Sequence, residues 1–415
     1  MQSALFALGV ACGCVEQRPV TRSPVNPGPP KPAIAESAGG FGEAAILAVD
    51  KKTLHASGAS LRMLGELTSS AYRYFRLFGP QTAARTCFAL RDVRWYLPVV
   101  AVHGDAHVEQ FTVTNETYGL EDYDHAGFGP AAVDLVRYAA SLHLACREVS
   151  WPCRPDDLVD VYFRAYRASL ERAPERSVPR VVERLRRKTS REASAWIVWA
   201  ESLMRPLPAS EEKECRAGWS RFALQQTEVR PDRPPAFYDV MRMGGLEMGV
   251  GSALEKKVLL RVRGPTDAPS DDLILESRTP GSPTDRACVW RPKHGTSLYT
   301  LMFMALLGPR MPEVYGFMRF EDVAKPELWV QSWDPGYREL SISDIENQPE
   351  FEELAVDAAR QLAGHFWTKF PEALRAHQRN AQLAAFDLVE KRARALAKEL
   401  AAEVVVSWER FRKAE

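Results

Sequence analysis

The sequence predicts an α+β protein that is rich in helices, and three regions with different patterns support this class. Apolar residues recur at helical spacing over 131–148 and predict an amphipathic helix. Residues 155–230 also have a mainly helical pattern. Short β-like runs gather between 236 and 340, and two long helical segments follow from Pro349. The strands therefore form a block of their own between helical blocks, as in α+β proteins.

Length and charge narrow the classes of function. The 415 residues are enough for one large core or for two to three domains. Lys plus Arg and Asp plus Glu balance at 54 each, so the basic excess typical of a nucleic-acid-binding protein is missing. After residue 15, no run approaches the 18 consecutive apolar residues that a transmembrane helix needs, so we expect no membrane span and no nucleic-acid partner.

The first 40 residues differ from the rest of the chain. Ser3–Val15 is short, apolar and rich in small residues, and residues 17–40 contain six prolines with few large apolar side chains. This order is typical of a bacterial lipoprotein precursor followed by a Pro-rich disordered linker, with Cys12 or Cys14 as the lipid-bearing residue. A secretory signal requires a positively charged residue near its start, but Met1–Ala4 contains no Lys or Arg. A cell-envelope lipoprotein and a cytoplasmic protein therefore both remain open.

Five further cysteines are scattered and show no metal-ligand spacing. We expect them to be buried free thiols that act as small apolar side chains. They are Cys87, Cys146, Cys153, Cys215 and Cys288.

Residues 41–235 are predicted to form a helical lobe that contains the chemically distinctive motifs. Helical spacing over 41–79 ends at Gly79-Pro80, a stop signal. Residues 97–102 form a continuous apolar run that predicts a buried strand. Residues 111–113 and 118–120 are expected to pair as a hairpin.

The remaining elements are predicted by short runs of apolar residues. Residues 236–340 are expected to form a strand-rich lobe, and residues 341–415 two helices that pack on the helical lobe. The expected strands cover 256–262, 273–275, 315–320 and 328–333, and the expected helix in this region covers 298–307.

Two short polar segments contain residues suited to catalysis. HGDAHVEQF at 103–111 and EDYDHA at 121–126 bring together three Asp, three His and a Gln. Asp122 follows Asp105 by 17 residues, and each lies just after a predicted strand, so both are expected to face one cleft. This layout resembles the catalytic loop and the metal-binding Asp of protein-kinase-like phosphotransferases.

Phosphoryl transfer needs a divalent cation held against the phosphates and a carboxylate near the attacking hydroxyl. Asp105 is the candidate base or orienting carboxylate. Gln110 and Asp122 are the candidate ligands of Mg²⁺, which prefers oxygen ligands. Asp124 is expected to supply a further carboxylate to the metal. His103 is grouped with Asp105 as a catalytic candidate, although a structural hydrogen-bonding role is favoured for it.

Asp134 opens the helix that follows the turn at Gly127, Gly129 and Pro130. A carboxylate there favours the helix N-terminus, and it can also connect this helix to the catalytic loop.

Several motifs together resemble the bacterial domain-of-unknown-function family 2252. They are HGDAHVEQF, DYDHAGFGPAAVDLVRYAASL, the later GVGS at 249–252, and SAYRYFRLFG at 70–79. The usual family forms are GDAHxxNF, NDFDEA, a GP turn, DLxRLAxS and SPFxFxRG. The similarity runs discontinuously from about residue 60 to the C-terminus.

This resemblance implies a kinase-like, two-lobe fold related to aminoglycoside and choline phosphotransferases. The order of the lobes is permuted, because the Gly-rich, strand-rich region follows the catalytic loop. The implied ligands are Mg²⁺ and ATP, with a small molecule or protein as phosphate acceptor. The resemblance assigns nucleotide binding to Gly249, Gly251, Ser252 and Glu276, and structural support to His107, Asp134 and Arg137.

Three positions depart from the family pattern. Gln110 replaces the metal-binding Asn and adds one methylene, and His125 replaces an acidic residue. In the family's LQxKEA strand, the phosphate-binding Lys falls on Leu275. Arg278, Lys256 or Lys257 can replace this cation only if its side chain moves across to the place of the missing Lys.

Three functions therefore remain open. The first is a kinase-like protein that binds Mg-nucleotide and transfers phosphate. The second is a degenerate pseudokinase that serves as a binding or scaffold module, as the changes at Gln110 and Leu275 suggest. The third is a metal-dependent hydrolase that uses the His and Asp residues of the two segments as ligands of Zn²⁺ or Mn²⁺.

Overall fold

The structure is a computed structural model, and residues 43–415 form one compact unit in it. It describes residues 47–56, 59–172, 177–189, 192–233, 235–246, 257–279, 288–292, 297–307, 310, 312–320, 327–364 and 372–414. The expectations for the N-terminal segment and for GVGS at 249–252 lie outside these residues.

The helices are α1 (Lys51–Ala56), α2 (Leu61–Ser69), α3 (Ala71–Phe75), α4 (Gly79–Ala89), α5 (Ala132–Ala145), α6 (Pro155–Glu171), α7 (Arg180–Thr189), α8 (Ala193–Ser202), α9 (Ala209–Val229), α10 (Ser297–Leu307), α11 (Gln348–Gly364) and α12 (Glu372–Lys413). The strands are β1 (Val100–Val102), β2 (Phe111–Val113), β3 (Tyr118–Leu120), β4 (Gly127–Gly129), β5 (Met204–Arg205), β6 (Val240–Leu246), β7 (Lys257–Val262), β8 (Leu273–Arg278), β9 (Tyr315–Met318), β10 (Leu328–Ser332) and β11 (Arg338–Glu339). The 3₁₀ turns used below are η2 (Arg94–Tyr96), η3 (Val108–Gln110) and η4 (Tyr123–His125). The fold is therefore mixed helix and sheet, as predicted.

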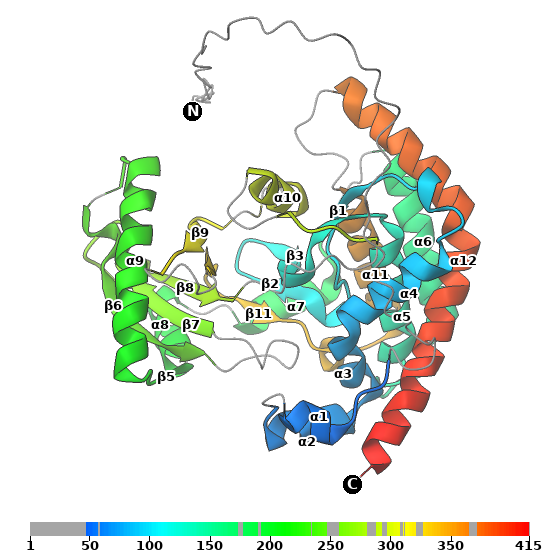
Figure 1. Cartoon of the computed structure of the whole chain (residues 1–415), viewed down its shortest axis with the longest axis horizontal. Coiled ribbons are helices and arrows are strands. Elements are labelled where there is room, and N and C mark those ends of the chain that lie inside the picture. Colours follow the sequence, from blue (N-terminus) through cyan, green and yellow to red (C-terminus); the bar gives the residue numbers. More distant parts are fainter. Residues whose placement is uncertain are drawn as a thin grey trace, which may run out of the picture. The chain divides into compact units, whose positions relative to one another are not determined.

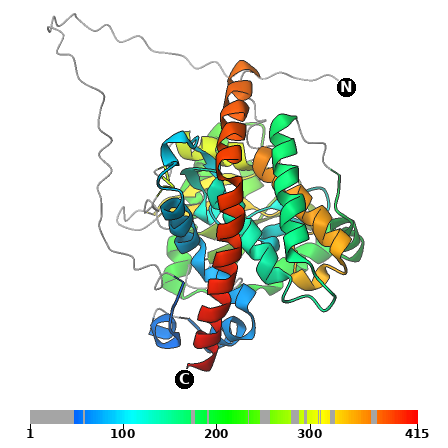
Figure 2. The same ribbon diagram turned by 90° about the vertical axis from the view of Figure 1, so that its right-hand side faces the viewer.

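Helix α5 lies at the centre of the largest hydrophobic core. Helices α6 and α12 pack against it, and α11 packs against α6, so segments from both ends of the described chain share this core (Figure 2). The predicted helix over 131–148 is confirmed, but its amphipathic character is wrong. Every residue of α5 except His143 is buried, because neighbouring elements cover the face that the sequence pattern leaves to solvent.

The expected helix stop at Gly79-Pro80 is wrong, because these two residues begin α4. Proline fits the first turn of a helix, where its missing N–H group would have no intrahelical partner. The preceding helical region is instead divided by serine caps. The side chains of Ser60 and Ser70 accept hydrogen bonds from backbone N–H groups at the starts of α2 and α3.

The predicted hairpin is confirmed, since β2 and β3 pair in antiparallel register, with Phe111 opposite Leu120. The strand predicted for residues 97–102 is shorter than expected. Only β1 forms, and it pairs with β4 in a two-stranded sheet. Pro98 has no N–H group to donate to a strand ladder, and Val99 is 70% exposed. The short β1 ends at Val102, directly before the candidate catalytic loop at 103–111.

A six-stranded antiparallel sheet, in the order β5-β6-β7-β8-β10-β9, contains the strands predicted beyond residue 236. Helix α9 covers one of its faces (Figure 1). Side chains alternate between the faces of a strand. Val258, Leu260 and Leu275 accordingly form an apolar core with Trp219 and Phe222 of α9. The other face of β7 and β8, called the charged face below, carries Lys257, Glu276 and Arg278. On the same face Leu259 and Ile274 pack with Trp196 and Ile197 of α8.

The cysteines form two disulfides, so the expectation of free thiols is wrong for four of the five. Cys87 pairs with Cys288, and Cys146 pairs with Cys153, whereas Cys215 is buried and belongs to neither disulfide. The sequence could not reveal the first pair, because its members are 201 residues apart.

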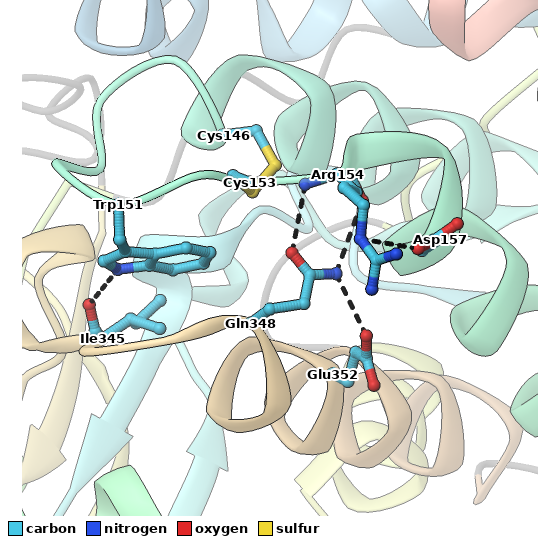
Figure 3. Close-up of a disulfide and its surroundings, with 8 residues drawn as sticks. All are labelled: Cys146, Trp151, Cys153, Arg154, Asp157, Ile345, Gln348 and Glu352. Atoms are coloured by element: carbon cyan, nitrogen blue, oxygen red, sulfur yellow. Dashed lines mark hydrogen bonds and ion pairs between the residues drawn. A yellow bond between two sulfur atoms is a disulfide. The ribbon is translucent and has the colours of Figure 1, made fainter.

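The Cys146–Cys153 disulfide closes the loop between α5 and α6, beside the start of α11 (Figure 3). The indole N–H of Trp151 donates to the carbonyl oxygen of Ile345 at 3.0 Å, and the Arg154 N–H donates to Gln348 at 3.1 Å. These bonds join the disulfide loop to α11.

Candidate functional site

Asp134, the third residue of α5, fixes the candidate catalytic loop at 103–111. Its two carboxylate oxygens accept the backbone N–H groups of His103 at 2.7 Å and of Gly104 at 2.8 Å. Burial raises the pKa of Asp134 to about 7, although both hydrogen bonds act in the opposite direction. Gly104 has a φ of +79°, and a Cβ there would lie 2.0 Å from the carbonyl oxygen of His125. Asp134 thus connects α5 to the loop, and only glycine fits at the turn.

His103 is fully buried, and both nitrogens of its ring form hydrogen bonds with backbone groups. Its Nε2 lies 2.8 Å from the carbonyl oxygen of Glu121, and its Nδ1 accepts the N–H of Asp105 at 3.3 Å. A carbonyl oxygen can only accept, so Nε2 carries the proton and the ring is neutral. Burial lowers the pKa of His103 to about 4. This geometry fits the structural role favoured from the sequence.

His103 makes the stability of the fold depend on pH. Its pKa falls from 6.5 to about 4 on folding, so its contribution is present above pH 6.5 and is lost as the pH falls towards 4. The wild type should therefore lose about 3 kcal/mol relative to His103→Gln over this interval, at about 1.4 kcal/mol per pKa unit. Urea unfolding of both proteins at pH 7, 5.5 and 4 measures this difference. A stability difference that does not change with pH would contradict the assignment.

Asp105 forms a buried ion pair with Arg137 of α5. Arg137 is fully buried, donates to the hydroxyl of Thr82 at 2.9 Å, and has its guanidinium 4.3 Å from the centre of the Phe75 ring. Burial raises the pKa of Asp105, while Arg137 opposes the rise. A Cβ on Gly79 would lie 2.8 Å from Asp105 Oδ1. The pair is therefore tightly enclosed by α3, α4 and α5.

The other oxygen of Asp105 faces two polar side chains. The amide nitrogen of Gln110 lies 3.4 Å from Asp105 Oδ2, and His125 Nδ1 lies 3.7 Å from the same atom. Because Gln110 uses its nitrogen here, its carbonyl oxygen is the atom left to coordinate a cation. His125, which replaces an acidic residue of the family motif, thus brings a titratable nitrogen next to Asp105.

Asp122 occupies the left-handed region with φ of +65° and ψ of +63°, and it is the only non-glycine residue with positive φ among those described. Strain of this kind is often retained at functional sites. Its carboxylate accepts a hydrogen bond of 2.9 Å from Arg278 at the end of β8, and its side chain is 40% exposed. The negative charge of Asp122 also raises the pKa of Asp105.

Glu276 pairs with Lys257 across the charged face of the sheet. Lys257 Nζ lies 3.7 Å from Glu276 Oε1, Arg278 lies 4.0 Å from the same oxygen, and Trp333 donates to Glu276 Oε2 at 2.9 Å. Leu275 points to the opposite face and is fully buried in the apolar core. Arg278 on the same strand and Lys257 on the neighbouring strand thus both lie beside Glu276, on the face opposite to Leu275.

His107 supports the loop from the side of α3. Its Nδ1 lies 3.1 Å from the hydroxyl of Tyr72, which also accepts the N–H of Glu109 at 2.9 Å. Glu109 in turn pairs with Arg76 at 3.2 Å. Burial lowers the pKa of His107 well below its usual value. This arrangement fits the supporting role assigned to His107.

The structure brings Asp105, Gln110, His103, Asp134 and Arg137 together, and it connects Asp122 to Glu276 through Arg278. Asp124 lies in η4, and its side chain is outside the described part of the structure. Gly249, Gly251 and Ser252 are outside it entirely.

Sequence reasoning missed Arg310. This residue pairs with Glu121 at 3.1 Å and donates to the Tyr123 hydroxyl at 3.0 Å. Burial raises the pKa of Glu121 to about 7. No sequence signal points to Arg310, which is 189 residues from Glu121.

A family model matches part of the chain. Residues 59–254 match the family model described as "Uncharacterized protein conserved in bacteria (DUF2252)", and the matched residues include the candidate catalytic loop, Asp122 and α5. No curated protein and no solved structure matches the chain.

Among the described residues, no group of three or more His, Cys, Asp or Glu side chains has an arrangement suited to a metal ion. No helix in the described ranges is both long and apolar enough to cross a membrane.

Proposed function

We propose that the protein is kinase-like, binds Mg²⁺ and a nucleotide between the catalytic loop and the charged face of the sheet, and transfers phosphate to an acceptor. The observation that carries this proposal is the chain of contacts from Lys257 through Glu276 and Arg278 to Asp122. It supplies cations for phosphates next to a carboxylate for the metal, which are the two requirements of phosphoryl transfer.

Each residue has a role in this proposal. Asp122 and the carbonyl oxygen of Gln110 hold Mg²⁺, which takes carboxylate and amide oxygens. Lys257 or Arg278 contacts the phosphates, and a nucleotide phosphate competes with Asp122 for Arg278. In protein kinases the partner of the phosphate-binding lysine is a glutamate on a helix; here Glu276 lies on the neighbouring strand. Asp105 orients the acceptor hydroxyl.

Calorimetric titration of the folded protein with Mg-ATP tests this proposal. Asp122→Asn and Lys257→Gln should each weaken binding by about tenfold to 100-fold, the range expected for a lost charge-assisted hydrogen bond of about 1.5–3 kcal/mol. Arg242→Gln is the matched control, because Arg242 lies on the same sheet and pairs only with the partly exposed Glu201 among the described residues. Absence of binding to folded wild type, or equal weakening in the control, would refute the proposal.

The second candidate is a pseudokinase that acts as a binding or scaffold module. The buried Asp105–Arg137 pair favours it, because an arginine that neutralises the candidate base makes this base weaker. The two disulfides also favour it, since they are typical of compartments outside the cytosol, where ATP is scarce. A module predicts that Asp105→Asn and Asp122→Asn leave the cellular phenotype intact. Loss of the phenotype with the fold retained would count against it.

The metal-dependent hydrolase has less support from the geometry. His103 Nε2 and His107 Nδ1 are both used in hydrogen bonds within the protein, so a zinc ion would have to displace those partners. Stoichiometric Zn²⁺ in purified protein would restore this alternative.

A further inference from the structure

A short exposed segment before the catalytic loop carries several large apolar side chains. Phe88 is 49% exposed, Trp95 67%, Tyr96 73% and Val99 70%. Single exposed apolar residues are normal, whereas several of them within one short segment, here 88–99, indicate an interaction surface. We call these four residues, together with Arg91 and Arg94, the aromatic patch.

The two arginines give the aromatic patch a positive charge. The guanidinium of Arg91 lies 4.0 Å from the centre of the Phe88 ring, and that of Arg94 lies 4.4 Å from the centre of the Trp95 ring. Within the described part of the chain, no ion pair joins either arginine to a carboxylate. The one acidic residue of the segment, Asp92, is neutralised by Arg392 of α12 at 2.9 Å. The patch is therefore apolar, aromatic and cationic.

The base of the patch is firmly attached to the protein. Leu90 is 2% exposed and packs with Ala132 and Val389. Arg392 donates to the carbonyl oxygen of Ala89 at 2.8 Å in addition to its bidentate contact with Asp92. These contacts hold the backbone from the α12 side while the rings remain exposed. The exposure is therefore a property of a fixed surface.

We propose that the aromatic patch docks on the surface of a bilayer that contains anionic phospholipid. Trp and Tyr side chains are favoured at the level of the lipid headgroups. Arginines beside them are attracted to the anionic headgroups, by about 1 kcal/mol each. The proposal is independent of what binds between the catalytic loop and the sheet.

The chain before Leu47 supports this partner. It includes the apolar Ser3–Val15 segment, whose cysteines have the sequence context of a lipid anchor. The 32 residues 15–46 can span at most about 105–115 Å. Leu47 accepts a hydrogen bond from Tyr74, which packs against Phe411 near the end of α12.

About 28 Å of helix separates Phe411 from Arg392 under the patch, at 1.5 Å per residue. An anchor and the aromatic patch can therefore reach one bilayer. Both disulfides also fit an oxidising compartment outside the cytosol.

Co-sedimentation of the full chain with phosphatidylcholine vesicles, with and without phosphatidylglycerol, tests the proposal. Arg91→Gln/Arg94→Gln should weaken binding to the anionic vesicles by about tenfold or more. The control is Leu224→Ser/Val229→Ser on α9, whose side chains are 63% and 73% exposed. This control should bind like the wild type, because its substitutions lie outside the aromatic patch. Any contribution of the N-terminal segment is the same in all variants and does not affect the comparison.

Fluorescence quenching by brominated lipid places the contact at the patch. Quenching should occur in the wild type and fall clearly in Trp95→Phe. Equal vesicle binding by the wild type and the arginine variant, or unchanged quenching in Trp95→Phe, would overturn the proposal. So would self-association that the patch substitutions abolish, since the occupant would then be a second copy of the chain.

Discussion

Arg137→Leu is expected to lower the free energy of unfolding by about 3–5 kcal/mol, the usual cost of removing one member of a buried ion pair. Arg137 is fully buried and Asp105 is only 6% exposed. The substitution would leave the Asp105 carboxylate buried without a counter-charge and Thr82 without its donor. Urea unfolding at pH 7, followed by circular dichroism, measures this loss.

The double variant Arg137→Leu/Asp105→Asn separates charge from packing. It removes both charges, so it should recover part of the stability lost in the single variant. The control is Arg62→Leu, whose side chain is 85% exposed and pairs with Glu66; it should cost less than about 1 kcal/mol. A double variant that is less stable than Arg137→Leu would show that the ion pair does not dominate.

Acidity gives a further check on Arg137→Leu. Burial raises the pKa of Asp105, and Arg137 opposes that rise more strongly than Arg76 does. Without Arg137 the pKa of Asp105 should therefore rise further. A carboxyl whose pKa is raised on folding destabilises the fold at high pH, and this penalty disappears as the pH falls towards the unfolded pKa. The deficit of Arg137→Leu should therefore be smaller at pH 5 than at pH 7.

Local patterns predicted much of the secondary structure. The β2–β3 hairpin follows from two short apolar runs separated by a polar turn, and helix α5 from spacing at every third or fourth residue. The prediction that α5 is amphipathic was wrong, since spacing within one helix does not reveal how many neighbours will cover it.

The arrangement of the candidate site was harder to predict, because its contacts join distant parts of the chain. Arg278 and Asp122 are 156 residues apart. Aligning one strand by its motif assigned the family's Lys to Leu275, but the β7–β8 register shows that this position faces the apolar core. Arg278 follows Glu276 on the same strand, whereas the position of Lys257 beside Glu276 became visible only once the two strands were paired.

Loss of the Cys87–Cys288 disulfide is expected to have the other large effect. For a closed loop of about 200 residues, the chain-entropy relation gives about 5 kcal/mol of stabilisation, so Cys87→Ser/Cys288→Ser should lose stability of that order. Cys146→Ser/Cys153→Ser is the matched control. Its cysteines are only 7 residues apart, and the same relation gives about 2 kcal/mol. Urea unfolding of both variants under non-reducing conditions compares the two losses.

The position of Cys288 connects this disulfide to the candidate site. Trp290, two residues later, exchanges backbone hydrogen bonds of 2.6 and 2.7 Å with Phe128 of β4. The disulfide therefore holds this segment against the strand that follows His125 and pairs with β1. Breaking it should loosen the support of the catalytic loop, so Mg-ATP binding should weaken in the Cys87 variant and remain unchanged in the Cys146 control. Alkylation of Cys87, Cys146, Cys153 and Cys288 in the unreduced chain unfolded in urea, mapped by mass spectrometry, would contradict both disulfides.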